Sequence, residues 1–216
     1  MSKFPEFHFQ YSSISACYLH TPGLESSLVT IEDIQKLTRE YGQAWGYPHA
    51  CRVLALVERI SEGISYDILA MRYAAYLHDW GAFPKFHTPG SDHAALSAEI
   101  ARTQILPQTS MPAHTIDIIV EAIARHDYRD PRPPSGPESL LLREADFLDF
   151  LGAIGIAREL AWGPNDIPRC LERLIARRDA LRNRFTLPAA QAIASRRLTE
   201  MDHFLNLLSE ESFGAV

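Results

Sequence analysis

Apolar side chains recur every three or four residues along most of this chain, which is the spacing that keeps them on one face of an α-helix. No segment longer than a few residues alternates apolar and polar positions as a half-buried strand would. The pattern therefore predicts an all-α fold, built as a single-domain helical bundle. The expected helices cover residues 30–45, 48–63, 65–79, from 91 past 100, 113–126, 137–162, 166–184 and 188–209.

Residues that favour helix starts support several of these boundaries. Thr30 is placed to cap the first helix, with Asp33 in the first turn to complete a capping box. Pro48 suits the first turn of the next helix, where its missing N–H is no loss. We expect Ser65 and Ser91 to cap the two helices that follow.

Length and composition are those of an ordinary globular protein. A chain of 216 residues is long enough to bury one large core. Residues 1–29 show no clear period and are expected to form an irregular arm over the core, which leaves 30–216 as the helical domain. No internal repeat or low-complexity tract suggests a further division.

Charge and cysteine usage narrow the class of partner. A net charge of −6 argues against a general nucleic-acid binder or a protein of anionic membranes. Cys17, Cys51 and Cys170 are scattered, without C-x-x-C spacing, and indicate reduced thiols. No basic-then-apolar leader and no apolar run near the roughly twenty residues of a membrane span occurs. We therefore expect a cytoplasmic protein.

The pair His78-Asp79 closes a short apolar helix. Ala75, Met71 and Ile68 precede His78 at helical spacing, so its imidazole continues the apolar face. An imidazole beside a carboxylate can bind one hard or borderline metal ion. Alone, the pair is weak evidence for a metal site, because a histidine on an apolar face is more often a hydrogen-bonded core residue.

Four other predicted helices place side chains of the same kind on their apolar faces. These are His49, His93, His126 and Asp146. Burying so many imidazoles and carboxylates without compensation is costly, and a bound cation removes that cost. The alternative is that each residue is satisfied in the core independently. The repetition on five helices favours one shared metal site.

These residues resemble a known family. The order His49, His78-Asp79, Asp146 is similar to the H…HD…D signature of the HD superfamily of metal-dependent phosphohydrolases, over about Ile31 to Glu211. His93 and His126 resemble the two extra histidines of members with a second metal. The stretches 92–102 and 145–158 are similar to a YedJ-like branch of bacterial HD hydrolases.

The resemblance implies a cofactor and its ligands. A divalent transition metal (Mn, Fe, Co, Ni or Zn) would be held as one or two ions. The first ion would be bound by His49, His78, Asp79 and Asp146. His93 and His126 would bind a second ion if Asp79 bridges, and would otherwise donate hydrogen bonds to a phosphate.

The implied activity is hydrolysis of a small phosphoester, a nucleotide or related phosphorylated metabolite, by a metal-activated water. Asp79, Lys85 and His126 are the candidate catalytic residues. Lys85, Arg129 and Arg132 lie in loops rich in Pro and Gly that follow two of the ligands, and could bind a phosphate. For each cation the alternative is an ordinary solvated loop residue.

Three further polar residues flank the ligand motifs. His87 and Asp127 are candidates for proton transfer or for orienting a ligand. Asp149, one turn past Asp146, could be a second carboxylate at the metal, although a local cap or ion pair is the commoner role. We rank it below the six ligands.

The carboxyl-terminal third offers packing signals more than chemical ones. Gly152 and Gly155 inside a predicted helix indicate close approach of a neighbouring helix. A series of arginines is interleaved with acidic residues and indicates a solvated face, with no nucleic-acid partner: Arg177, Arg178, Arg182, Arg184, Arg196 and Arg197. A leucine stripe indicates core first and a homodimer face second: Leu171, Leu174 and Leu181.

Two other functions share the predicted site. Some proteins that resemble this superfamily are di-iron oxygenases with the same ligand order. A non-catalytic nucleotide-sensing module, in which the metal only organises the bundle, is the third option. The partner expected for the leading hypothesis is a small phosphorylated molecule, with no membrane involved.

Overall fold

A computed structural model of the chain describes residues 28–213 and residue 215. Within these ranges the chain forms nine α-helices and no strand, which confirms the all-α prediction. The helices are α1 Ile31–Tyr41, α2 Gly46–Ile60, α3 Ile68–Leu77, α4 His93–Ile100, α5 Ala113–Ala124, α6 Pro137–Asp149, α7 Gly152–Trp162, α8 Ile167–Leu181 and α9 Pro188–Glu211. The arm expected over 1–29 lies, except for residues 28 and 29, outside the described residues.

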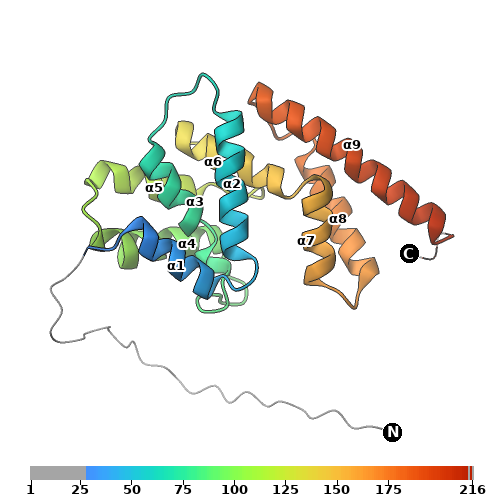
Figure 1. Ribbon diagram of the computed structural model, residues 1–216, viewed down its shortest axis with the longest axis horizontal. Helices are drawn as coiled ribbons and strands as arrows, with labels where there is room; N and C mark the ends of the chain where they lie inside the picture. Colours follow the sequence, from blue (N-terminus) through green and yellow to red (C-terminus); the bar gives the residue numbers. More distant parts are fainter. Residues whose placement is uncertain (1–27, 214, 216) are drawn as a thin grey trace, which may run out of the picture.

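Helices α1 to α6 form the larger body of the molecule, and α3 lies at its centre (Figure 1). It packs against α1, α2, α5 and α6, and seven of its ten residues are buried. α2 also packs along α6, and α4 lies on α5. The last three helices lie to one side of this body, where α7 packs against α8 and α9, and α9 also contacts α6 and α2 (Figure 1).

The core is continuous through the larger body. Trp80, Phe83 and Phe147 are among its largest fully buried side chains. Trp80 donates its indole N–H to Thr38 Oγ1 at 3.1 Å, so the one polar atom of this buried ring is satisfied. Because Trp80 follows Asp79 directly, its packing fixes the backbone at the carboxyl end of α3. No helix in the described part of the chain has both the length and the apolar character needed to cross a membrane.

Of the three predicted N-caps, the structure confirms one and corrects two. Thr30 and Asp33 form the predicted capping box. Ser65 is not a cap: Asp67 precedes α3 and accepts from Ala70 N at 2.9 Å. Ser91 is not a cap either, because Asp92 accepts from the first-turn amides of α4. An ionised carboxylate at either position satisfies the free N–H groups and also interacts favourably with the helix dipole.

The prediction of one helix over 137–162 was wrong. α6 ends at Asp149 and α7 begins at Gly152, whose φ of 72° lies in the left-handed region that L side chains rarely adopt. A Cβ on Gly152 would lie 2.9 Å from Arg197 Cγ of α9. The close approach expected at this glycine is therefore real. The break turns α7 away from the α6 axis and starts the carboxyl-terminal helices.

Candidate metal centre

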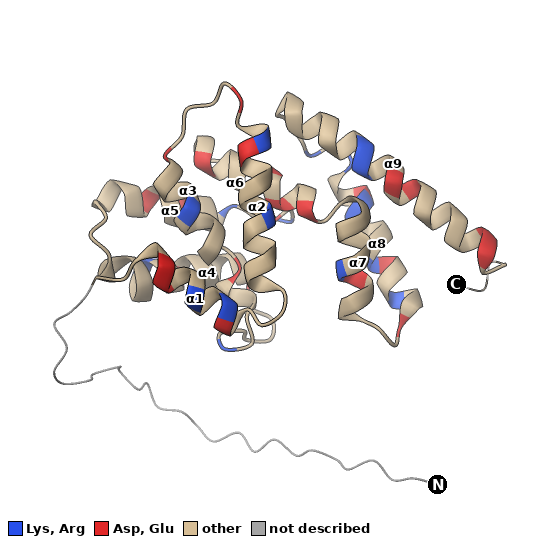
Figure 2. Cartoon of the chain, viewed as in Figure 1, with Lys and Arg blue, Asp and Glu red and all other residues tan. Residues whose placement is uncertain are grey.

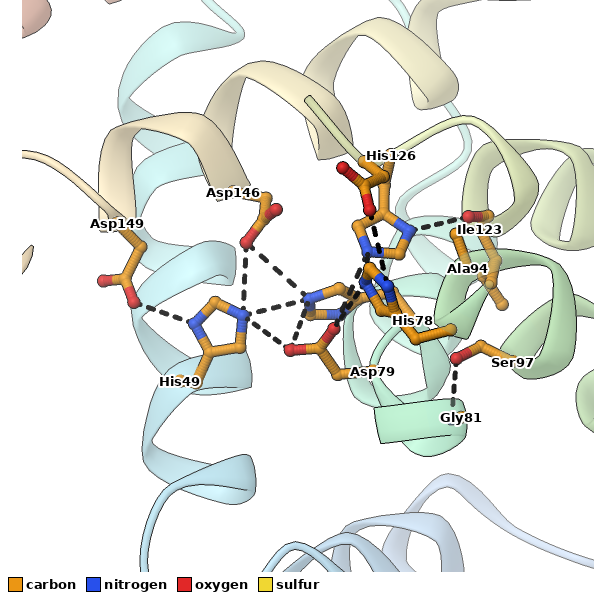
Figure 3. Close-up of polar contacts among 12 residues, drawn as sticks. His49, His78, Asp79, Gly81, Ala94, Ser97, Ile123, His126, Asp146 and Asp149 are labelled. Atoms are coloured by element: carbon orange, nitrogen blue, oxygen red, sulfur yellow. Dashed lines mark hydrogen bonds and ion pairs between the residues drawn. The ribbon is translucent and has the colours of Figure 1, made fainter. Parts of the chain in front are cut away.

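The six predicted ligands converge from five elements of the larger body. His49 comes from α2, His78 ends α3 and Asp79 follows it, His93 begins α4, His126 follows α5, and Asp146 comes from α6. Figure 3 shows five of them pointing toward one another: His49, His78, Asp79, His126 and Asp146. His49 and Asp146 lie on the buried faces of their helices, whereas His78, Asp79 and His126 follow within two residues of a helix end. Packing of these helices carries the polar groups inward.

The carboxylate of Asp79 lies between two pairs of imidazoles. Its Oδ2 is 3.2 Å from His49 Nε2 and 3.5 Å from His78 Nε2. Its Oδ1 is 3.5 Å from His93 Nε2 and 3.6 Å from His126 Nε2. Each oxygen therefore faces one histidine pair. This is the placement that a carboxylate shared by two adjacent ions requires.

Three of the imidazoles are held from behind by acceptors that fix their tautomer. The acceptors are Ala75 O for His78 at 2.8 Å, Ile123 O for His126 at 2.7 Å, and Asp149 Oδ2 for His49 at 2.8 Å. Carbonyl and carboxylate oxygens only accept, so Nδ1 carries the proton in each ring. The lone pair of Nε2 then points into the cluster, as metal-binding histidines require.

With both rings of a pair neutral and no cation between them, these lone pairs oppose one another. His49 Nε2 lies 3.0 Å from His78 Nε2, and His93 Nε2 lies 3.2 Å from His126 Nε2. Asp146 Oδ1 is buried without a hydrogen-bond partner in the described part of the chain, although it lies 3.2 Å from His49 Nε2. Convergent, unsatisfied acceptors in a buried site are costly, and a divalent cation relieves all of them at once.

The donor set therefore fits a metal. Two groups of three residues have ligand atoms within 4.8 Å of one another: His49, His78 and Asp79, and Asp79, His93 and His126. Asp146 adds a carboxylate to the first group, 3.9 Å from His78 Nε2. Imidazole and carboxylate together suit divalent first-row transition ions.

Protonation in the cluster follows from burial and from the carboxylates. Burial lowers the pKa of His78 to about 4, so this ring is neutral. Burial also opposes protonation of His49, but hydrogen bonds to Asp146, Asp149 and Asp79 raise its pKa to about 10. A proton on His49 thus compensates the carboxylates where a cation would otherwise do so.

A carboxylate behind the cluster holds His49 in place. Asp149 is buried and accepts from His49, and it also accepts from Arg52 Nε at 2.7 Å and from Arg158 Nη1 at 2.5 Å. Burial alone would raise the pKa of Asp149, but these contacts outweigh it and hold the pKa well below its usual value. Asp149 therefore orients a ligand instead of joining the ligand set, and it ties α6 to α2 and α7.

The cluster opens onto a cavity of about 410 Å³. Asp79, His93 and Asp146 line it from the metal side. Arg129, Arg173 and Arg177 line it as well, with the aromatic rings of Tyr128 and Phe150 and the carboxylate of Asp127. Three cations thus share a cavity with the predicted metal ligands. A small anionic molecule suits such a space.

Only one of the three predicted phosphate-binding cations lines this cavity. Arg129 does so, and Asp127 orients it by accepting from Nε at 3.0 Å and from Nη2 at 2.5 Å. Asp127 Oδ2 also lies 3.4 Å from His93 Nδ1. Burial alone would raise the pKa of Asp127, but the hydrogen bonds from Arg129 hold it below its usual value. Asp127 therefore serves as an ionised acceptor.

Lys85 and Arg132 lie elsewhere, against the sequence-based prediction. The ammonium of Lys85 lies 3.5 Å from the centroid of the Tyr41 ring, a cation–π contact on the outside of the larger body. Arg132 pairs with Asp130 and donates to Ala124 O. Lys85 thus packs on a ring of α1, and Arg132 pairs with an acid of its own loop and with the end of α5. His87 is exposed, and nothing connects it to the ligands.

Two arginines of the carboxyl-terminal helices line the cavity although they are not among the predicted site residues. Arg177 was assigned to a solvated face, but its Nη1 donates to Glu159 Oε2 at 2.7 Å, and Glu159 is only 3 % exposed. Arg173 lies one turn earlier on α8 and pairs with the same carboxylate. The available signal was this spacing of four residues, which puts both guanidinium groups on one side of α8.

Comparison with known proteins agrees with the geometry. Residues 46–151 match the model of the HD domain family. This segment contains all six predicted ligands. No curated protein sequence matches the chain.

Several solved structures share the fold. A predicted HD superfamily hydrolase from an uncultured Thermotogales bacterium is 24 % identical, with a TM-score of 0.59 over 83 % of this chain and 91 % of that one. Bacillus subtilis YpgQ in complex with ADP is 20 % identical, with a TM-score of 0.61 over 84 % and 94 %. A Lactobacillus plantarum protein is 20 % identical, with a TM-score of 0.64 over 84 % and 95 %. Residues 46–151, which contain the ligand cluster, therefore form an HD domain.

Proposed function

We propose that this protein is a metal-dependent phosphohydrolase that acts on a small phosphorylated molecule, with nucleotides as the first candidates. The observation that carries the proposal is the position of Asp79. Its two oxygens face two histidine pairs, and the same residue lines a cavity that contains three arginines. The HD domain supports the hydrolase chemistry, and the ADP bound to the structurally similar YpgQ supports a nucleotide.

The ligand set divides into two sites that share Asp79. His49, His78, Asp79 and Asp146 would hold one ion, and Asp79, His93 and His126 would hold the second. Bound there, Mn, Fe, Co, Ni or Zn would lower the pKa of a water molecule and neutralise charge on the phosphoryl oxygens. His126, with its Nδ1 bound to Ile123 O and its ring buried, acts as a ligand in this proposal.

The chain's own residues would bind and orient the substrate. Asp127 holds Arg129 at the cavity, so the guanidinium is placed before substrate arrives. Tyr128 and Phe150 form an edge-to-face pair 6.2 Å apart beside it and offer apolar contact to the organic part of the substrate. Because Asp127 is ionised, it does not supply a proton to the leaving group.

The test combines metal analysis with phosphate release. The purified protein is analysed for bound metals and then assayed with that metal against a set of phosphomonoesters, diesters and nucleotides. Asp79→Ala removes the shared carboxylate, so metal content should fall and turnover should drop about 1000-fold or more. Asp117→Ala is the matched control, because this carboxylate is exposed and pairs only with Arg102.

Three outcomes would overturn the proposal. The first is turnover that survives in Asp79→Ala or after the metal has been removed. The second is oxygen uptake with Fe(II) in place of phosphate release, which would identify a di-iron oxygenase. The third is tight nucleotide binding without turnover under every metal, which would identify a sensor.

A further inference from the structure

Helix α8 brings two arginines to the cavity from outside the segment that matches the HD domain. Arg173 and Arg177 line the same cavity as Asp79, His93 and Asp146. The metal ligands come from α2 to α6 and the turns between them, whereas these arginines come from the carboxyl-terminal helices. Figure 2 shows positive residues on α7 and α8 beside the larger body. Arg173 and Arg177 therefore come from a different part of the fold than the predicted ligands.

A buried acid and two aromatic rings hold the pair. Glu159 of α7 accepts from Arg177 Nη1 at 2.7 Å and lies 2.5 Å from Arg173 Nε. The guanidinium carbon of Arg177 lies 4.5 Å from the Phe150 ring centroid, and that of Arg173 lies 4.0 Å from the Trp162 ring centroid. Stacking and pairing restrict both side chains, so less conformational entropy is lost when they bind a ligand.

The pair carries charge that its surroundings do not cancel. Arg129 is matched by Asp127, which accepts from it with both oxygens. Arg173 and Arg177 share the single carboxylate of Glu159, so together they present a net positive charge to the cavity. Nε of Arg177 is buried and has no hydrogen-bond acceptor among residues 28–213, so the fold satisfies this cation only in part. A guanidinium with free N–H groups matches the geometry of a phosphate or carboxylate.

The position of this charge matters as much as its sign. A reacting phosphoryl group must lie at Asp79, where the ligand set can act on it. The arginines of α8 come from another region of the fold, and a cavity of about 410 Å³ is large enough for more than one phosphate. A substrate with only one anionic group would leave the net positive charge of this pair without a counter-charge beyond Glu159.

We propose that Arg173 and Arg177 bind a second anionic group of the substrate. This inference rests on the proposed phosphohydrolase function and narrows its substrate class to phosphoesters with two anionic groups, such as a nucleoside diphosphate or a bisphosphate. The two arginines determine specificity. The bonds that break and form stay at the metal centre.

The experiment measures binding of non-hydrolysable probes to the Mn²⁺-loaded full-length protein by calorimetry. Methylphosphonate carries one anionic group, methylenediphosphonate carries two phosphoryl groups, and phosphonoacetate carries a phosphoryl group and a carboxylate. The wild type should bind methylenediphosphonate about 10-fold or more tightly than methylphosphonate. Phosphonoacetate shows whether a carboxylate can replace the second phosphoryl group. Metal content is measured before and after titration, so that extraction of the ion is not counted as binding.

Arg177→Gln and Arg173→Gln should weaken methylenediphosphonate binding about 10-fold and leave methylphosphonate within about 2-fold of the wild type. Arg182→Gln is the matched control, since Arg182 directly follows α8 but pairs with Asp202 away from the cavity. Its affinities should not change. Thermal unfolding of each variant shows that it has folded, and Arg177→Lys should restore part of the lost affinity because it keeps the charge.

Equal loss of both probes, or a preference for two anionic groups that survives both arginine variants, would overturn the inference. The result is separable from the proposed function. A protein that hydrolyses monophosphates with no effect of either arginine keeps the function and rejects the inference. Arginine-dependent binding of methylenediphosphonate without turnover of any phosphoester rejects the function and keeps the binding site.

Discussion

The helices that carry the metal ligands and the helices that carry the arginines place polar groups by different means. In the larger body, His78 and His126 are each held by a carbonyl three residues earlier in the chain, and both rings are buried. In the carboxyl-terminal helices, Arg173 and Arg177 are held across a helix pair by Glu159 and remain partly exposed. The larger body fixes these histidines through hydrogen bonds to nearby backbone carbonyls. The carboxyl-terminal helices fix their arginines through ion pairs between long side chains.

This difference suits the two kinds of ligand. A metal site tolerates little variation in ligand position, so local hydrogen bonds to rigid backbone favour it. An anion-binding surface works with flexible side chains whose charge is steered by ion pairs. Together the two regions place acceptors and donors around one cavity. Substitutions in the first region should therefore change metal affinity, and substitutions in the second should leave metal affinity unchanged.

The largest effect should come from Asp149, which joins the two regions. Its carboxylate orients His49 in the larger body and binds Arg158 of α7. Asp149→Asn keeps the shape but removes the charge, so His49 loses its ionised acceptor and two arginines lose their partner. We expect metal affinity to fall by about 10- to 100-fold, as measured by titration with Mn²⁺.

Asp130→Asn is the control for that variant. Asp130 also pairs with an arginine, Arg132, but lies outside the ligand cluster. Its loss should leave metal affinity unchanged. An Asp149→Asn protein that binds metal as tightly as the wild type would show that His49 needs no charged support.

A smaller effect, on stability and not on metal binding, is expected from Glu159. Glu159→Gln leaves Arg173 and Arg177 without their shared carboxylate. The free energy of unfolding should fall by about 1–3 kcal/mol, nearer the lower value because Arg173 is partly exposed. Chemical denaturation measures this change.

Metal content is the second readout for Glu159→Gln. It should stay at the wild-type level, because no ligand contacts Glu159. A parallel loss of metal and stability would mean that the two regions form one cooperative unit, which would weaken the comparison.

The ligand set could be predicted because its geometry is local. His49, His78 and Asp146 stand at helical spacing with apolar residues, so packing the apolar face dictates where each side chain points. Their order along the chain added the resemblance to the superfamily. The convergence of these side chains therefore follows from patterns that a single sequence contains.

The cavity cations could not be predicted because their positions depend on tertiary contacts. Lys85 lies over Tyr41, and Arg132 turns back to Asp130, although both follow ligand motifs. Arg177 looked like a surface residue because its partner, Glu159, lies on another helix. The helix break was hidden because apolar residues continue across it, and only Gly152 marked the point.

The smallest predicted effect tests a cap in the larger body. Asp67 accepts from Ala70 N at the start of α3, whereas Ser65 is exposed and lies two residues too early. Asp67→Ala should lower the free energy of unfolding by about 1 kcal/mol, and Ser65→Ala should change it by less than about 0.5 kcal/mol. Metal affinity should stay constant in both variants, because His78 is held from Ala75 at the far end of the helix. A larger loss of stability in Ser65→Ala than in Asp67→Ala would show that Ser65 is the N-cap of α3 after all. A loss of metal affinity in Asp67→Ala would show that the ligands depend on the whole of α3 and not on its last turn.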